Sequence, residues 1–437
     1  MNRFLKIGLI ATSILACIGI GSFSHEILEL IVSCGHRIPS SDILSDYFIG
    51  VFWAVAFFFI ILFSCMNPVH KSAFLVIWLS KCLVTLGVML IYENAYGLDA
   101  YYYFQSASSP IPSWHGFAFG QGTDLVTTIS WVLIHIGNIG VSYHALKVIF
   151  SMIGLLGIYF FYLGVVDITG NKNPRNLYLL ALFPSVLFWS SILGKDPLNL
   201  FGIGLYFFGA SKWYRKEKLI YLVYVIAGIS IATLIRSWYL AILSFPFLVL
   251  MLRSWHTKKN AGKISIIAIF FGMVAVLGSL MRILTVSLHA DDLTHAISTT
   301  NTISHSWSYG GSAVSEIPKF TSLAGIITFA PYGIFTALFR PLPGEVMNGF
   351  GLIAGLENVF LIYLMCRFVF FSHFKDWLRG GLGTWLSLLI FLWSALYAFI
   401  SPQNLGSAVR FKLQILPVML VMIILGKWRK DQALCAE

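Results

Sequence analysis

The sequence predicts an all-α polytopic membrane protein with about 12 transmembrane helices, long outer loops and one re-entrant or interfacial segment. Composition is the first observation. Of the 437 residues, 58% are hydrophobic and 11% are charged, and the mean hydropathy is +0.82, whereas soluble domains carry roughly 25% charged residues. The second observation is that apolar runs of about 20 residues recur, each long enough to cross a hydrocarbon layer. Soluble multidomain enzymes, disordered chains and outer-membrane barrels, whose strands alternate, are therefore excluded.

The apolar runs define the candidate spans in chain order. They lie at about residues 4–22, 46–66, 72–92, 140–166, 177–193, 197–211, 219–235, 237–252, 264–285, 350–371, 382–400 and 410–426. The first run follows Arg3 and Lys6 as in a signal sequence, but it lacks a clear small-x-small cleavage site, so we interpret it as an uncleaved anchor. We expect residues 1–437 to form a single integral membrane domain.

The distribution of charge predicts the orientation of the spans. With the N-terminus in the cytoplasm, 19 of the 29 Lys and Arg residues fall in inside segments, against five of the 18 Asp and Glu residues, as the positive-inside rule expects. Both termini are then cytoplasmic. Counting the apolar stretch 322–338 as a further full span would reverse every later loop. We therefore expect it to be re-entrant or to lie in the outer interface.

Loop lengths predict which face holds the chemistry. The long connections are 23–45, the first large outer loop 93–139, and the second large outer loop 286–349, which contains the re-entrant segment. Functional residues concentrate in long, structured loops, so we expect any chemistry on the outer face. The sequence shows no internal repeat and no matched pair of broken helices, which argues against a transporter.

The first outer loop supplies two candidate catalytic carboxylates, Glu93 and Asp99. Asp99 follows the third span closely, and a carboxylate at the membrane surface can act as a general base. Tyr102 lies beside it as a candidate contact for a sugar. The alternative is that Asp99 caps a short helix beginning at Ala100, with Tyr102 in an interfacial aromatic belt.

Basic residues at the outer ends of spans are candidates for binding the phosphate of a lipid. Arginine suits this role because its planar fork grips phosphate oxygens with two hydrogen bonds. The alternative for each is snorkelling to headgroups or pairing with a nearby acid. The candidates are Lys195, Arg236, Arg282, Arg340, Arg410 and Lys412.

Other polar residues near these cations have predicted supporting roles. Asp196, next to Lys195 at a tight turn, orients it or caps the following helix, unless the two charges only solvate the turn. Glu345 and Glu357 are positional candidates, because a carboxylate at membrane depth usually faces an interior or a functional cavity. Gln403 and Asn404 suit sugar hydroxyls.

Several site classes are not expected. The six cysteines suggest no disulfide framework, and there is no Lys/Arg block of the kind that binds nucleic acid. No HExxH, Walker or GxGxxG pattern is present, so we predict no metal site and no certain cofactor. A divalent cation held by Glu93, Asp99 and lipid phosphates is chemically reasonable, but nothing in the sequence requires it.

Three segments together resemble the GT-C superfamily of membrane glycosyltransferases. They are GLDAYYY at 97–103, PSVLFWSSILGKD at 184–196 and NLGSAVRFKLQILP at 404–417. The resemblance is one of arrangement over about two-thirds of the chain. It departs from the family in having a single Asp99 where an acidic pair is common, and in lacking a large soluble C-terminal domain.

The resemblance implies a reaction and a location. A polyprenyl-(pyro)phosphate-linked sugar or oligosaccharide would be the donor, in cell-surface polysaccharide assembly at the bacterial inner membrane, with membrane lipid as the other partner. Asp99 would deprotonate the acceptor hydroxyl, and arginines would stabilise the leaving phosphate. Two alternatives remain open: a Wzy-type O-antigen or capsule polymerase, in which the basic cluster dominates and Asp99 is positional, and a flippase or other transporter of lipid-linked oligosaccharide.

Overall fold

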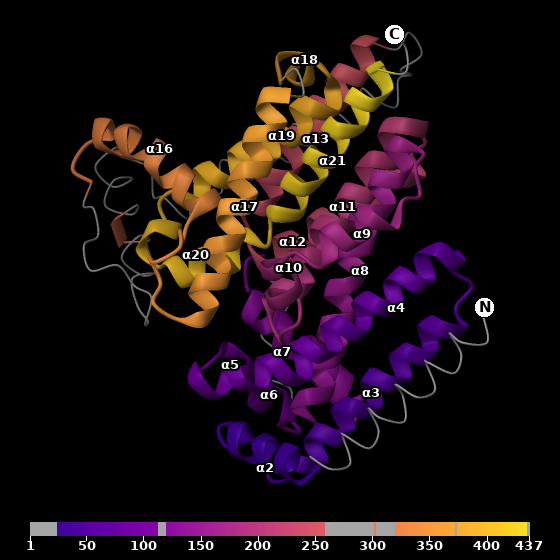
Figure 1. Cartoon of the computed structure of the whole chain (residues 1–437), viewed down its shortest axis with the longest axis vertical. Helices are drawn as coiled ribbons and strands as arrows, with labels where there is room; N and C mark the ends of the chain where they lie inside the picture. The colour runs from indigo at the N-terminus through magenta and orange to yellow at the C-terminus, as the bar shows by residue number, and fades with distance from the viewer. Residues whose placement is uncertain (1–23, 112–118, 258–300, 303–319, 372–373, 435–437) are drawn as a thin grey trace, which may run out of the picture.

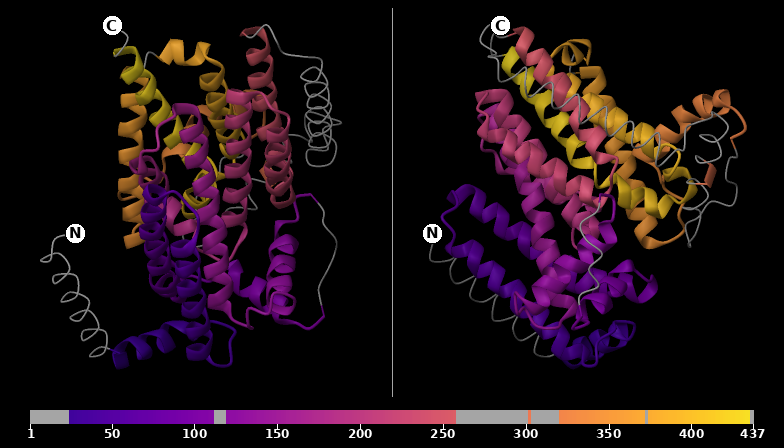
Figure 2. Two further views of the ribbon diagram at one scale, coloured as in Figure 1. Left: turned by 90° about the vertical axis from the view of Figure 1, so that its right-hand side faces the viewer. Right: turned by 180° about the vertical axis from the view of Figure 1, so that it is seen from behind.

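The computed structural model describes residues 24–111, 119–257, 301–302, 320–371 and 374–434, and its regular elements in these ranges are all helical. The predicted helical class is therefore confirmed for these residues. Figures 1 and 2 show the helices as an elongated bundle, with the amino-terminal helices at one end and the carboxy-terminal helices at the other.

The amino-terminal part contains one interrupted span. Its elements are α2 (Ser24–Gly35), α3 (Ile43–Phe63), α4 (Pro68–Leu83), the π-helix η1 (Val84–Val88), α5 (Met89–Ala95), α6 (Asp99–Ser108), α7 (Gly122–His135) and α8 (Tyr143–Thr169). The elements α4, η1 and α5 run on without a gap, so that together they match the predicted span 72–92.

The remaining elements include several short helices. They are α9 (Pro174–Ala181), α10 (Pro184–Trp189), α11 (Lys195–Lys216), α12 (Ile220–Ile235), α13 (Tyr239–Thr257), α16 (Leu323–Phe339), α17 (Gly349–Phe371), α18 (Phe374–Arg379), α19 (Gly381–Tyr397), the 3₁₀ turn η3 (Ser401–Gln403), α20 (Leu405–Lys412) and α21 (Leu416–Leu434).

Four helices among the described residues are long and apolar enough to cross a membrane. They are Ile43–Phe63, Pro68–Ala95, Tyr143–Thr169 and Gly349–Phe370. A fifth is added if Leu405–Lys412 and Leu416–Gln432, which bend by 53° at their junction, count as one span. The predicted total of about 12 is thus not confirmed, and the predicted spans 4–22 and 264–285 lie outside the described residues.

Two predicted spans are broken where continuous helices were expected. The stretch 177–193 forms α9 and α10 because Pro184 lacks an N–H and favours extended backbone at the residue before it; Phe183 indeed has φ −62° and ψ 125°. The stretch 410–426 bends between α20 and α21.

The ambiguous stretch 322–338 forms α16, a short apolar helix that contains Pro331 and extends to one side of the bundle (Figure 1). Its re-entrant character stays a prediction.

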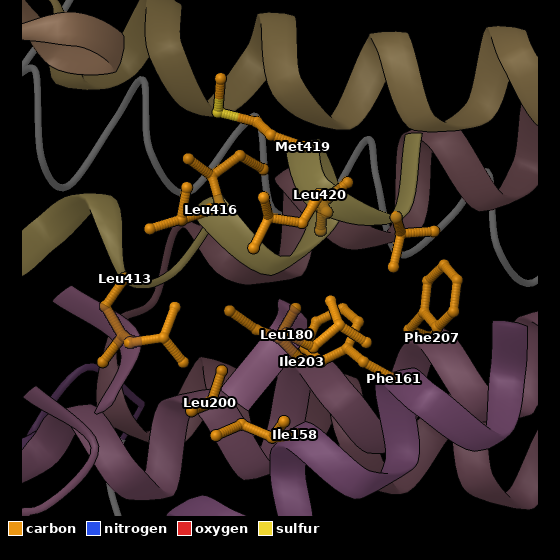
Figure 3. Packing of buried hydrophobic residues seen from close by; sticks show 14 of the residues in the cluster. Ile158, Phe161, Leu180, Leu200, Ile203, Phe207, Leu413, Leu416, Met419 and Leu420 are labelled. Carbon is orange, nitrogen blue, oxygen red and sulfur yellow. The ribbon is translucent and has the colours of Figure 1, made fainter. Parts of the chain in front are cut away.

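The centre of the bundle is a close-packed contact between α8 and α11. A Cβ atom placed on Gly204 would lie 2.2 Å from the carbonyl oxygen of Gly157, so only glycine permits this approach of two backbones. Around this contact the apolar side chains of α8, α9, α11 and α21 interdigitate; Figure 3 shows Ile158, Leu180 and Leu200 facing Leu416. This core fixes α11 and α21, and hence the segments at their N-terminal ends.

Helix ends are fixed by capping groups, one of which comes from another helix. The buried carboxylate of Asp46 in α3 accepts hydrogen bonds from the backbone N–H groups of Tyr143 and His144, at 2.9 and 3.0 Å. These N–H groups open α8, where a negative charge also complements the helix dipole. At its other end α8 stops at Gly170, whose φ of +70° is left-handed.

Candidate functional site

Arg410 of α20 joins two aspartates from distant parts of the chain. Its Nε donates a hydrogen bond to Oδ2 of Asp196 at 2.6 Å, and its Nη1 lies 3.7 Å from Oδ2 of Asp99. The guanidinium carbon is 5.6 Å from the centre of the Trp189 ring. Asp196 is buried, whereas 63% of the Asp99 side chain is exposed. One guanidinium thus connects a buried carboxylate with an accessible one.

Local structure explains how the two aspartates are presented. Asp99 is the first residue of α6, after the extended residue Leu98, and Asp196 lies in the first turn of α11, after the extended residue Gly194. Carboxylates in a first turn are favoured by the helix dipole. The expected cap of a helix starting at Ala100 is not found, since α6 begins at Asp99 itself and has no side-chain cap.

Two more predicted cations lie near Arg410. Lys195 is within electrostatic range of Asp99, Asp196, Arg236 and Arg410. The Arg236 guanidinium lies 4.7 Å from the centre of the Phe411 ring. We call Asp99, Lys195, Asp196, Arg236 and Arg410 the outer cluster. It has three cations and two carboxylates, and this surplus of positive charge suits an anionic ligand.

Two aromatic residues next to the outer cluster were not among the predicted site residues. Trp189 lies beside Arg410, and Tyr103 is buried close to Asp99. Burial, together with the negative charge of Asp99, raises the pKa of the Tyr103 phenol above its ordinary value. Tyr102, the predicted sugar contact, is exposed. Tyr103 belongs to the buried face of α6, which also holds Ala100, Phe104 and Ala107 at helical spacing, and Tyr102 does not.

Glu93, the second predicted catalytic carboxylate, is separate from the outer cluster. Its Oε2 accepts a hydrogen bond from Lys147 Nζ at 2.7 Å, and its Oε1 accepts one from the Tyr143 hydroxyl at 2.9 Å. Both side chains of the ion pair are buried, with exposed fractions of 1% for Glu93 and 0% for Lys147. We call Glu93, Tyr143 and Lys147 the buried triad. With both oxygens occupied, Glu93 is not open to a cation or a substrate in this conformation.

Lys412 and Glu357 lie on the other side of α20. Lys412 is buried and donates a hydrogen bond to the side-chain oxygen of Asn358 in α17. The neighbouring Glu357 accepts a hydrogen bond from the backbone N–H of Ser185, at the start of α10, at 2.5 Å. These contacts join α10, α17 and α20. The Lys412 side chain therefore contacts α17 and not Asp99 or Asp196, the partners of Arg410.

Arg340 and Glu345 form a closed pair on the segment after α16. Nη2 of Arg340 lies 2.7 Å from Oε1 of Glu345, whose Oε2 accepts a hydrogen bond from the N–H of Leu342 at 2.6 Å. The hydrogen bond to Glu345 raises the pKa of the Arg340 guanidinium. Burial opposes ionisation of Glu345, but the bonds from Arg340 and Leu342 outweigh it and lower the pKa of this carboxyl.

The remaining predicted residues support or fall outside the cluster. Gln403 and Asn404 are buried, and the Asn404 side chain accepts a hydrogen bond from the N–H of Ser407 at 3.0 Å, which caps α20. Arg282 lies outside the described residues. Lys81, in the predicted third span, was expected only as one of three alternative partners of Glu357; its Nζ instead donates to Ser190 and Ser191. It thereby secures the turn that leads to Lys195.

The comparisons with known proteins give no relative. Among the residues that the structure describes, no three His, Cys, Asp or Glu side chains gather as a metal site would require. No family model matches the sequence, and no curated protein or solved structure matches it. The outer cluster is therefore the basis for a proposed function.

Proposed function

We propose that the protein is a membrane glycosyltransferase that takes a sugar from a polyprenyl-(pyro)phosphate-linked donor. The acceptor would be glycosylated on the outer face of the bacterial inner membrane, in cell-surface polysaccharide assembly. The observation that supports this most is the contact of Arg410 with both Asp99 and Asp196. It places an accessible carboxylate beside an anchored guanidinium, and the reaction needs one of each.

The guanidinium has the role of stabilising the leaving group. When the acceptor oxygen attacks the anomeric carbon, the bond from that carbon to the donor phosphate oxygen breaks, and its electron pair leaves with the (pyro)phosphate. Negative charge grows on this group, and fixed cations that face it stabilise the transition state. The bond from Arg410 to buried Asp196 fixes the plane of the fork, and Lys195 and Arg236 add positive charge nearby.

The carboxylate has the role of the general base. Asp99 Oδ2 would accept the proton of the acceptor hydroxyl as the new glycosidic bond forms. Its exposed fraction of 63% leaves room for an incoming acceptor. Glu93, by contrast, is occupied within the buried triad, so Asp99 is the stronger candidate of the two.

A Wzy-type polymerase is the second candidate, and the same contact supports it. In that reaction Arg410 and its neighbours would bind the undecaprenyl pyrophosphate of one repeat unit, and Asp99, at 3.7 Å, would only orient the arginine. The two functions differ in their products. A single-transfer enzyme adds one sugar to each acceptor, whereas a polymerase makes a ladder of repeat units.

The proposed donor is tested with purified protein in detergent and synthetic sugars linked to a short polyprenyl pyrophosphate. We expect transfer to an acceptor, a loss of about 10²- to 10³-fold in Arg410→Lys because a point charge does not replace the fork, and full activity in Arg253→Lys. Arg253 is the matched control because it donates to backbone oxygens of Leu378 and Arg379, on α18. Equal activity of both variants, or transfer only from nucleotide sugars, would contradict the proposal.

A further inference from the structure

A second polar feature lies between the carboxy-terminal halves of α17 and α21. These helices pack against each other and run together toward the C-terminus, away from α20 (Figure 1). A hollow of about 670 Å³, open to the surroundings, separates their facing sides. Lys427, on its wall, follows the start of α21 at Leu416 by 11 residues, which is about 17 Å along the helix axis. The hollow is therefore distinct from the outer cluster.

The wall from α17 is a helical stripe of four residues with Leu364 and Phe368 beside it. Tyr363, Cys366, Arg367 and Phe370 line the hollow, and they are spaced i, i+3, i+4 and i+7, which places them on one face of a helix. All four side chains are exposed. Along the axis Tyr363 comes one turn before the cation Arg367 and the aromatic Phe370 follows it, so Arg367 is the basic residue of this stripe.

The wall from α21 has the same spacing, and its basic residues come after its apolar one. Ile423, Gly426, Lys427 and Lys430 occupy positions i, i+3, i+4 and i+7 and line the hollow opposite α17. Gly426 has no side chain to fill the space, and the two lysines follow the apolar Ile423. Asp431, the next acid along α21, is not one of the lining residues.

We propose that this hollow is a binding site for an anionic phospholipid, with the headgroup phosphate at Arg367, Lys427 and Lys430 and an acyl chain against Tyr363 and Ile423. Among the described residues the lining holds three cations and no acid, which matches a phosphate. Basic pockets between transmembrane helices at the cytoplasmic end bind anionic headgroups. The predicted topology puts this end in the cytoplasm, where the leaflet is negatively charged. The site is independent of the proposed reaction.

Lipid retention by the full-length protein tests the site directly. We would titrate dioleoyl phosphatidylglycerol, dioleoyl phosphatidylcholine or glycerol 3-phosphate and count bound lipids by native mass spectrometry. The triple variant Arg367→Gln, Lys427→Gln, Lys430→Gln should weaken phosphatidylglycerol binding on the order of 100-fold, at about 5-fold for each cation removed. The matched control is the triple variant Arg215→Gln, Lys216→Gln, Lys218→Gln, which changes exposed charges in the last turn of α11 and just after it and should keep wild-type binding.

Two cysteines that are exposed among the described residues supply an independent readout. Phosphatidylglycerol should slow alkylation of Cys366, in the hollow, but not of Cys65, which is exposed at the end of α3; phosphatidylcholine and glycerol 3-phosphate should protect neither. Cys366→Trp, which fills the hollow without a change of charge, should also weaken lipid binding. Equal binding of both lipids, equal loss in the two triple variants, protection by glycerol 3-phosphate, or unchanged binding in Cys366→Trp would each overturn the proposal.

Discussion

Glu93 and Asp99 are only six residues apart, yet the fold places them in opposite environments. Glu93 is buried and each of its oxygens accepts a hydrogen bond, one from Lys147 and one from Tyr143. Asp99 is mostly exposed and lies 3.7 Å from Arg410, whose strongest contact is with Asp196. The buried triad is complete without a ligand. The outer cluster leaves one carboxylate open to solvent.

The difference shows how burial separates structural from chemical roles for the same type of residue. A buried charge must be paired and hydrogen-bonded, because its desolvation is costly; this is satisfied in the buried triad, which joins α5 to α8. An accessible carboxylate held near fixed cations can instead meet a substrate. The account therefore predicts loss of stability from changes in the triad and loss of activity from changes in the cluster.

The largest effect on stability should come from the buried triad. Glu93→Gln leaves the Lys147 ammonium buried without its partner, and breaking a buried pair in this way costs about 3–5 kcal/mol. We expect a large fall in Tm, measured in detergent. The double change Glu93→Gln, Lys147→Met removes both charges and should recover much of the loss. As a control, Asp167→Asn, in the part-exposed pair with Lys212 at 3.7 Å, should have a small effect.

Asp196→Asn should lose activity while the protein still folds, because Arg410 keeps its contact with the carboxylate of Asp99. The amide no longer offers a charged acceptor to Arg410 Nε, and a hydrogen bond between charged groups contributes about 1.5–3 kcal/mol. If Asp196 positions the arginine, transfer should fall about 10- to 100-fold, with a raised KM for the phosphate-linked donor. An unchanged KM would show that Asp196 serves only the packing of α11.

The smallest effect should come from the pair of Arg340 and Glu345, which lies in neither region. The folded-state pKa of Glu345 is lowered from its ordinary value of 4.5, so the pair stabilises the fold above that pH and stops doing so as the pH falls through the folded pKa. Glu345→Gln should lower stability at pH 7 by less than about 1 kcal/mol, since the pair is part-exposed. The Tm difference from wild type should vanish in strong acid. The control is Asp376→Asn, which breaks the exposed pair with Arg379. Its Tm difference from wild type should be near zero both at pH 7 and in strong acid.

Composition and apolar runs predicted the helical membrane class, because burial in a bilayer needs only long apolar helices. The breaks were harder to predict. Pro184 divides a run that hydropathy alone makes continuous, and Pro417, the second residue of α21, cannot donate an N–H back to Leu413 at the bend between α20 and α21. The two broken segments are also the ones that hold Trp189 and Arg410.

Part of the candidate site could be predicted, and the rest depends on contacts far apart in sequence. The residues Asp99, Lys195 and Arg410 were candidates on charge alone, but Arg410 and Asp196 are 214 residues apart, and no local pattern pairs them. Lys412 was grouped with Arg410. Side chains two positions apart on a helix, however, point in directions that differ by about 200°. Lys412 therefore meets α17 instead.

The most direct test of the central claim is the single-turnover rate of Asp99→Asn, with a polyprenyl-linked donor and product length measured together. The substitution keeps the size of the side chain, and Tm should stay at the wild-type value because Asp99 is exposed. We predict a loss of about 10²- to 10⁴-fold, with one sugar added per acceptor in the wild type. The matched control is Asp124→Asn, in the first turn of α7 on the same predicted loop, which should keep its rate. A ladder of repeat units that persists at full rate in Asp99→Asn would contradict the account and favour the polymerase.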